Sequence, residues 1–256
     1  MNAATFLNVL QQGSAPFTPA SISGLQIWLK RGTGLYQETT GASATTAASA
    51  AADPIGTWLD QSGNGNHPVA PANTQRLAYR ASQYGTKPSA QGDGTDDYLS
   101  KTSLSFGSLG SGNYTIWFVA KPGSSTRILF YLVSGGGQLF CFQNIAGKQR
   151  FNHKDNAATE VAGGAWDVTA PTAAYYYGVI IRNGTSFTQR IDGVVPTGGT
   201  QTATLSTTTA NTLYLMSNQG ASAYNDGHLV EFGIHNSALS GADLTNLETY
   251  LANTAL

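Results

Sequence analysis

One stretch of sequence decides the fold: residues 175–191, which read YYYGVIIR-NG-TSFTQRI. Both arms are rich in the aromatic and β-branched residues that strands favour, and Asn-Gly is the pair preferred in a two-residue type I′ turn. The stretch therefore predicts an antiparallel β-hairpin with Asn183-Gly184 at its tip and a second turn at Asp192-Gly193.

The chain on either side of this hairpin continues the pattern of short apolar runs separated by turn residues. Further strands are expected at residues 25–29, 115–120, 127–133, 138–142, 212–216 and 227–235. Near the C-terminus, Leu244, Leu247 and Leu251 form a helical stripe after Ser240, which with Asp243 resembles a capping box. Strands without intervening helices, followed by one helix over about 241–252, predict an all-β, two-sheet antiparallel jelly-roll sandwich with no second hydrophobic core.

Composition narrows the function classes. The 256 residues carry 13 basic and 14 acidic side chains, for a net charge of −1, and only 11% of residues are charged. This balance offers no electrostatic footprint for nucleic acid or an anionic membrane, so neither is an expected partner. No stretch approaches the roughly 18 apolar residues of a membrane-spanning helix.

The N-terminal residues look different from the rest. Residues 1–16 are expected to be an arm and linker, and residues 17–256 the jelly-roll domain. Ala3, Phe6, Leu7 and Leu10 have helical spacing, so the arm either packs on its own domain or docks on a partner. The first basic residue is Lys30, which predicts that no secretory signal peptide is present.

Two polar segments and one thiol have simple structural interpretations. Residues 39–52, built mainly of Ala, Thr, Ser and Gly, predict an exposed loop without core residues, whereas the Gly- and Asn-rich residues 61–67 predict an ordered one. The single cysteine, Cys141, lies in an apolar run and is expected to be a buried thiol.

Four strings of residues resemble a known family when taken in order: Ser23 to Leu29, Trp58 to His67, Lys87-Pro88 through Asp93-Gly94-Thr95-Asp96-Asp97-Tyr98-Leu99, and Gly227 to Ser240. They resemble the concanavalin A-like, laminin-G-type jelly rolls of bacteriophage and prophage structural proteins, over nearly everything after Phe17. Gly92 departs from the pattern, since such proteins usually carry a large apolar residue there. The resemblance implies a lectin-like sandwich located in the virion, made in the host cytoplasm, with capsid or tail proteins as partners.

No catalytic set is evident in the sequence. Glycoside hydrolysis needs two carboxylates about 5–9.5 Å apart, and Glu231 has no partner on its own strand. His228 and Glu231 are three residues apart, which in a regular strand places them on opposite faces. His67, His153, His228 and His235 show no metal-type spacing. We therefore expect a protein that is not an enzyme.

Binding a sugar without catalysis requires fewer functional groups than hydrolysing it. Trp166 and Tyr224 are expected in loops, where each ring could stack on a sugar, with Asn225 and Asp226 holding hydroxyl groups; a protein contact is the alternative use of such rings. Asp93, Asp96 and Asp97 could supply oxygens to calcium, as could Asn64 and Asn66. Asx-type turn hydrogen bonds are the favoured interpretation of these side chains, and no cofactor is expected.

The function that follows is a non-enzymatic bacteriophage virion structural protein, either a capsid decoration protein or part of a tail or fibre, with host-surface glycans as further partners. The alternative is a free carbohydrate-binding protein or a polysaccharide depolymerase subunit. Because open sheet edges with few charges tend to pair, we also expect a homo-oligomer.

Overall fold

The computed structural model describes residues 16–104, 112–124, 127–134, 137–145, 148–154, 160–169, 174–202 and 211–253. Side chains are not described for residues 134, 137–145, 153–154, 160–169 and 201. The helix expected around Phe6 and Leu7 lies outside the described residues, and so does the side chain of Cys141.

The described strands form two layers, and within each layer every pair of hydrogen-bonded strands is antiparallel. In the larger layer the order is β15-β14-β13-β8-β17-β6-β5-β3, with β1 also paired to β17. Its strands are β1 (Leu25–Leu29), β3 (Pro54–Ile55), β5 (Leu77–Tyr84), β6 (Lys87–Gln91), β8 (Tyr114–Lys121), β13 (Tyr176–Asn183), β14 (Ser186–Ile191), β15 (Thr200–Thr202) and β17 (His228–His235).

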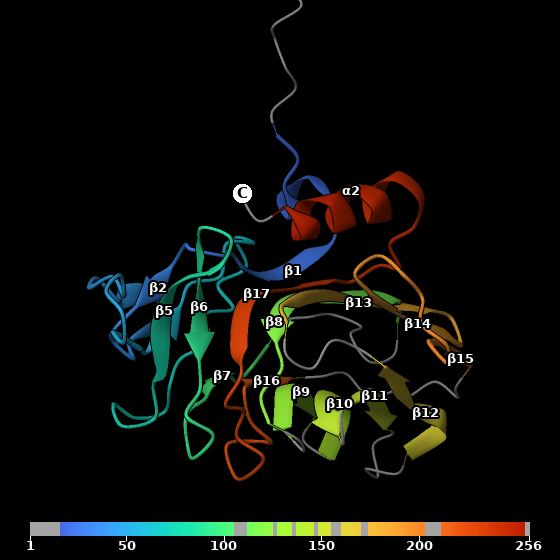
Figure 1. Cartoon of the computed structure of the whole chain (residues 1–256). Coiled ribbons are helices and arrows are strands. Elements are labelled where there is room, and N and C mark those ends of the chain that lie inside the picture. The colour runs from blue at the N-terminus through green and yellow to red at the C-terminus, as the bar shows by residue number, and fades with distance from the viewer. Residues whose placement is uncertain are drawn as a thin grey trace, which may run out of the picture.

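The smaller layer has the order β12-β11-β10-β9-β16-β7. Its strands are β7 (Leu99–Lys101), β9 (Arg127–Ser134), β10 (Gly137–Ile145), β11 (Lys148–Lys154), β12 (Glu160–Thr169) and β16 (Thr212–Leu215). A short pair, β2 (Leu35–Tyr36) and β4 (Thr57–Trp58), lies beside them, with 3-10 turns η1 (Pro19–Ser21) and η2 (Gly41–Ser43). Figure 1 shows the two layers facing each other, which confirms the antiparallel sandwich.

The main core fills the space between the layers. Phe118 and Phe232 of the larger sheet meet Phe130 of the smaller one, with ring centroids 6.0 and 5.4 Å apart. Trp58 and Phe118 are fully buried here. Burial of this kind contributes about 1.5–3 kcal/mol for each large side chain.

A second core lies on the outer face of the larger sheet, where the helix α2 (Gly241–Ala252) covers it (Figure 1). Leu247 and Leu251 pack there with Trp28 and Trp117, which are also buried. The helix was predicted, but the expectation of no second core was wrong. The larger sheet presents apolar residues on both faces and therefore needs a cover on each.

The hairpin that decides the fold is present with its turn displaced by one residue. Asn183 pairs with Ser186, so the two loop residues are Gly184 and Thr185, and only Gly184 has a positive φ, of 60°. The Gly184 N–H donates to Asn113 Oδ1 at 2.8 Å, which helps hold the turn in this position. A turn with both central residues at positive φ, as type I′ requires, occurs instead at Asp192-Gly193.

Three further expectations concern the loop at residues 39–52, the N-cap of α2 and membrane-spanning helices. Residues 39–52 are largely exposed, but Ala44 is buried and Ala48 belongs to the main core, so the expectation of a loop without core residues was wrong. The α2 helix begins after Ser240 without a side-chain cap hydrogen bond, so the predicted capping box was wrong. Among the described residues, no helix is both long and apolar enough to cross a membrane.

Candidate functional site

The candidate site lies at one end of the sandwich. There the loop after β6 (residues 92–98) and the loop before β17 (residues 216–227) lie side by side (Figure 1). A Cβ atom on Gly92 would lie 2.1 Å from the carbonyl oxygen of Asn225, so this close approach requires glycine. That contact explains why position 92 carries glycine in place of the large apolar residue that the family resemblance led us to expect. Asp226 ties in a third loop, since its Oδ1 accepts from the Ser124 N–H at 2.7 Å.

Three half-buried tyrosines gather at this end, and we call Tyr98, Tyr214 and Tyr224 the tyrosine platform. The ring centroid of Tyr98 lies 6.1 Å from that of Tyr214 and 6.2 Å from that of Tyr224. Tyr224 is held by its hydroxyl, which donates to the Gly220 carbonyl at 2.6 Å. Tyr214 stands directly opposite Tyr131, which lies in a small apolar cluster on the outer face of the smaller sheet. Rings fixed in this way lose little entropy on binding a ligand.

The sequence-predicted residues Tyr224, Asn225 and Asp226 do lie in this loop cluster, but they play different parts. Asn225 is only 3% exposed, and its Oδ1 accepts from the Gly227 N–H at 2.7 Å. Hydrogen bonding to Ser124 lowers the pKa of Asp226, against partial burial, which acts to raise it. Asn225 and Asp226 therefore shape the loops, and Tyr224 is the ring that they present beside Tyr98.

Trp166 does not belong to the loop cluster that carries Tyr224. It was expected in a loop, but the structure places it in β12, paired with Phe151 of β11, because residues 160–169 continue the ladder begun by β11. Three strands, β11, β10 and β9, separate β12 from β16, which carries Tyr214. The structure therefore does not bring Trp166 together with Tyr224.

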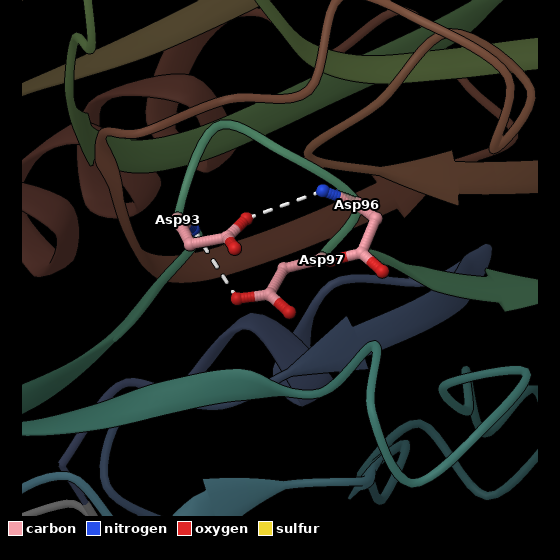
Figure 2. A group of neighbouring side chains, drawn as sticks. All are labelled: Asp93, Asp96 and Asp97. Atoms are coloured by element: carbon pink, nitrogen blue, oxygen red, sulfur yellow. Dashed lines mark hydrogen bonds between the residues drawn. The ribbon is translucent and has the colours of Figure 1, made fainter.

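The acidic residues Asp93, Asp96 and Asp97 form a compact group beside the platform (Figure 2). Asp93 Oδ1 accepts from the backbone N–H groups of Thr95 and Asp96, at 2.7 and 3.2 Å. In return, Asp97 Oδ2 accepts from the Asp93 N–H at 3.2 Å. These are the Asx-type turn bonds favoured from the sequence. One oxygen from each of the three carboxylates also lies within 4.8 Å of the others, a spacing that suits a hard cation such as calcium.

The environments of two of these carboxylates differ. Burial raises the pKa of Asp97 to about 7, helped by the negative charge of Asp93. The pKa of Asp93 is lowered, because amide hydrogen bonds from Thr95 and Asp96 outweigh its partial burial. The adjoining hollow, lined by Arg80, Gln91 and Asp226 among others, measures about 190 Å³. This is below the roughly 300 Å³ at which ligand pockets begin, so the group suits an ion better than a sugar chain.

Asn64 and Asn66, the other oxygen donors considered for a cation, use their amide nitrogens instead. The Nδ2 of each donates to the carbonyl oxygen of Gln26, at 3.1 and 2.9 Å. The buried Asp60 carboxylate anchors the same loop by accepting from the Trp28 and Asn66 N–H groups. Residues 61–67 are therefore ordered, as predicted, by contacts that hold β1.

The carboxylate of Glu231 is also engaged in hydrogen bonds within the protein. It is fully buried and accepts from Arg31 Nε, from Trp28 Nε1 at 2.7 Å and from the Tyr250 hydroxyl at 2.7 Å. A bulge in β17 between Leu229 and Glu231 shifts the register. His228 contacts Tyr175 on the same outer face of the larger sheet, so the prediction that His228 and Glu231 face opposite sides was wrong.

A sandwich of two antiparallel layers of this kind has the architecture of the lectin-like jelly rolls. The profile of the concanavalin A-like lectin/glucanases superfamily matches residues 93–245, more than half of the chain, so the protein belongs to this superfamily. No curated protein sequence matches it.

Solved structures show the same fold at low sequence identity. The botulinum neurotoxin serotype D ligand-binding domain, solved with N-acetylneuraminic acid, has a TM-score of 0.60 and 12% identity over 91% of this chain and 52% of that one. The binding domain of Paraclostridial mosquitocidal protein 1 gives 0.59 and 11%, over 92% and 52%. A Trypanosoma rangeli sialidase gives 0.57 and 12%, over 96% and 37%. This chain thus spans about half or less of each.

Proposed function

We propose that this protein is a non-enzymatic carbohydrate-binding protein whose ligand stacks on the tyrosine platform. The observation that carries the proposal is the grouping of Tyr98, Tyr214 and Tyr224, three half-buried rings held at 6.1 and 6.2 Å on one loop-rich end. Aromatic faces offer apolar area to the C–H face of a pyranose, and phenolic hydroxyls bond its polar rim. The similarity to a toxin domain solved with N-acetylneuraminic acid supports a glycan as ligand.

We also propose that the protein does not catalyse a reaction on its ligand. Glu231 is neutralised by Arg31 within the second core, and the hollow beside Asp93 and Asp97 is small for a sugar chain. Two of the three structures compared above are binding domains, although the third is a sialidase. Release of reducing ends from any bacterial polysaccharide by the purified chain would contradict the non-enzymatic proposal and favour a depolymerase subunit.

A glycan array followed by calorimetry on the strongest glycan tests sugar binding. We expect saturable binding, weakened about tenfold in Tyr214→Ala, which corresponds to about 1.4 kcal/mol and is of the size measured for aromatic contacts. Tyr175→Ala is the matched control, because Tyr175 is also partly exposed but packs near Tyr84 and His228 on the other sheet. Absence of saturable binding to every glycan, or equal loss in both variants, would contradict the proposal.

A virion role is the second candidate, and it is supported by the residue strings that resemble phage and prophage structural proteins. Two of these strings, Ser23 to Leu29 and Trp58 to His67, meet in the structure through the Asp60 and Asn66 contacts with β1. On this proposal the protein decorates a capsid or belongs to a tail or fibre, binds neighbouring virion proteins and contacts bacterial surface glycans. Density fractionation of purified particles tests it: the chain should co-sediment with particles, and its absence from them would exclude the role.

A further inference from the structure

A short turn packs against the tyrosine platform. It consists of residues 217–223, which follow β16 and lead to Tyr224, and we call it the strap. A Cβ atom on Gly220 would clash with the hydroxyl of Tyr98, so the strap approaches this ring as closely as a glycine allows. The Gly220 carbonyl also accepts the hydrogen bond from the Tyr224 hydroxyl. The strap is therefore part of the surface that a ligand on the platform would meet.

Gln219 is the side chain that the strap places near the remaining ring of the platform, Tyr214. Its Nε2 donates to the Tyr131 hydroxyl at 3.1 Å. Tyr131 stands directly opposite Tyr214 in the pairing of β9 with β16, and directly opposed side chains of antiparallel strands lie side by side on one face. The Gln219 amide is therefore beside Tyr214. Gln219 is exposed, and its Oε1 makes no hydrogen bond to any residue that the structure describes.

The backbone of the strap holds Gln219 in an unusual conformation. Its φ is 54°, and that of Ala223 is 50°, both in the left-handed region that residues with a side chain rarely adopt. The turn is closed by the Asn218 N–H, which donates to the Ser222 carbonyl at 2.9 Å. Backbone conformations of this kind are costly and are concentrated at ligand sites, where they fix the position of a functional side chain. Gln219 is therefore pre-organised for binding.

The groups around Tyr214 on this face are uncharged. Its directly paired neighbours are Ser100 on β7 and Tyr131 on β9. The strap itself consists only of serine, asparagine, glutamine, glycine and alanine. The charged residue next to Ser100, Lys101, pairs with the core-facing Leu213, so its side chain leaves the opposite face of β7. A carboxylate placed on Tyr214 would therefore lose water without gaining a charged partner, which is unfavourable.

We propose that the strap and Tyr214 form one site for an uncharged glycan, in which Gln219 selects the sugar. A pyranose stacks on Tyr214, and Gln219 Oε1 accepts a hydrogen bond from one of its hydroxyl groups. Because Tyr131 holds the Nε2 of the amide, Oε1 has a fixed direction, and a sugar whose hydroxyl points elsewhere leaves it unpaired. The inference rests on the proposed carbohydrate-binding function and adds the class of ligand and the residue that selects it.

Matched neutral and acidic sugars test the class of ligand. Cellotriose, β1,4-mannotriose and α1,4-galactotriose are printed on an array beside the corresponding trisaccharides of glucuronic, mannuronic and galacturonic acid, which carry a carboxylate at C6. The strongest neutral sugar and its acid are then titrated into the purified chain by calorimetry. We expect the neutral sugar to bind about tenfold more tightly, because the acid must give up the hydration of a carboxylate.

Substitutions test the role of Gln219 with the same three neutral sugars, among which the wild type should prefer one. Gln219→Ala should weaken binding of that sugar about fivefold and reduce the preference, because one hydroxyl loses its acceptor. Tyr131→Phe leaves the strap sequence intact and removes only the hydroxyl that holds the amide, so it should also reduce the preference. Gln83→Ala is the matched control, because Gln83 is also exposed but lies near the end of β5 in the larger sheet.

The outcomes separate the inference from the proposed function. A preference for neutral over acidic sugars, with selectivity among the neutral ones reduced in Gln219→Ala and Tyr131→Phe and kept in Gln83→Ala, supports the site. Tighter binding of the acids, or unchanged selectivity in Gln219→Ala, overturns the inference and leaves the proposed function standing if Tyr214→Ala still weakens binding. Absence of saturable binding to these six sugars also overturns the inference, and only absence across the whole glycan array overturns the proposed function as well.

Discussion

Glu231 and Arg31 are 200 residues apart in sequence, yet their side chains form a fully buried ion pair. Arg31 also donates to the backbone carbonyl of Asn253 at 2.8 Å, so it ties β17 to the end of α2. Burying two charges is costly, and such a pair is tolerated only when its remaining hydrogen-bonding groups are satisfied. Trp28 and Tyr250 complete that satisfaction at the Glu231 carboxylate.

Removing one partner of this pair should be much more damaging than removing a partner of an exposed pair. We expect Glu231→Ala to lower the free energy of unfolding by about 3–5 kcal/mol, because it leaves the Arg31 charge buried and unpaired. The control is Glu248→Ala, which breaks the partly exposed pair with Arg190 and should cost about 1 kcal/mol or less. Urea denaturation of both variants measures the difference. Equal losses would show that the buried pair carries no special weight.

Asp97 should make stability depend on pH. Its pKa is raised to about 7 in the folded protein by burial and by Asp93, against about 3.9 in an unfolded chain. The folded state therefore holds this proton more tightly, and stability is lost as pH rises from about 4 to about 7. Asp97→Asn, which carries no charge at any pH, should gain melting temperature relative to the wild type as pH rises through that window.

Calcium offers an independent check on the same residue. If the carboxylates of Asp93, Asp96 and Asp97 hold a cation, calcium chloride at pH 8 should raise the melting temperature of the wild type and have a smaller effect on Asp97→Asn. Thermal scans at pH 5 and pH 8, with and without calcium, make the comparison. A pH-independent difference between the two proteins would show that Asp97 does not titrate in this window.

At the scale of elements, α2 depends on its buried face rather than on its cap. Ser240 is exposed and in extended backbone, and the chain enters the helix through Gly241 at a φ of 55°. The serine side chain makes no cap hydrogen bond in this conformation. Leu247 and Leu251, in contrast, are fully buried over the larger sheet. Tertiary packing therefore provides most of the stability of this 12-residue helix.

Two substitutions in α2 separate these contributions. Ser240→Ala should change the free energy of unfolding by less than about 0.5 kcal/mol, although a working N-cap is worth about 1 kcal/mol. Leu247→Ala should cost about 2–5 kcal/mol, because it leaves a cavity in the second core. Chemical denaturation followed by circular dichroism measures both. A loss of 1 kcal/mol or more in Ser240→Ala would show that the cap forms in solution.

The elements that could be predicted from sequence are those with strong apolar runs, such as β8, β9 and β13. The strands β5, β11 and β12 were not predicted, because their sequences LAYRASQY, KQRFNHK and EVAGGAWDVT contain no continuous run of large apolar residues. Ladder hydrogen bonds to neighbouring strands hold these segments, and such partners are not visible in a local pattern. Trp166 was misplaced in a loop for the same reason.

The candidate site could be predicted only in part, again because pairing joins distant residues. Tyr224 was identified from its own polar neighbours, but Tyr98 and Tyr214 lie within short apolar runs that give no sign of exposure. They become a platform only when β16 pairs with β7 and the Gly92 loop meets Asn225.

At the scale of the whole molecule, the strands at the sheet edges differ greatly in length. The edge strands β3 and β15 of the larger layer contain only two and three residues, and β7 at one end of the smaller layer pairs further with Val69. In contrast, β12 extends over ten residues, Glu160–Thr169, and in the described residues it pairs only with β11. Long edge strands present unpaired N–H and C=O groups that favour pairing with another chain, particularly where charges are few. β12 is therefore the edge at which association is expected.

We accordingly predict that the purified chain forms a small, closed homo-oligomer. Light scattering coupled to size exclusion at micromolar concentrations should give a mass that is a multiple of 26.7 kDa and does not grow with concentration, since closed symmetry limits assembly. Glu160 and Asp167 are the only charges in β12, so adding a further one with Val161→Lys should shift the mass toward the monomer, because a charge on an edge strand opposes edge-to-edge pairing. Thr249→Lys, on the exposed side of α2, is the control and should leave the mass unchanged. A mass of 26.7 kDa at every concentration would exclude the oligomer, and an oligomer equally unaffected by both lysines would place its interface away from β12.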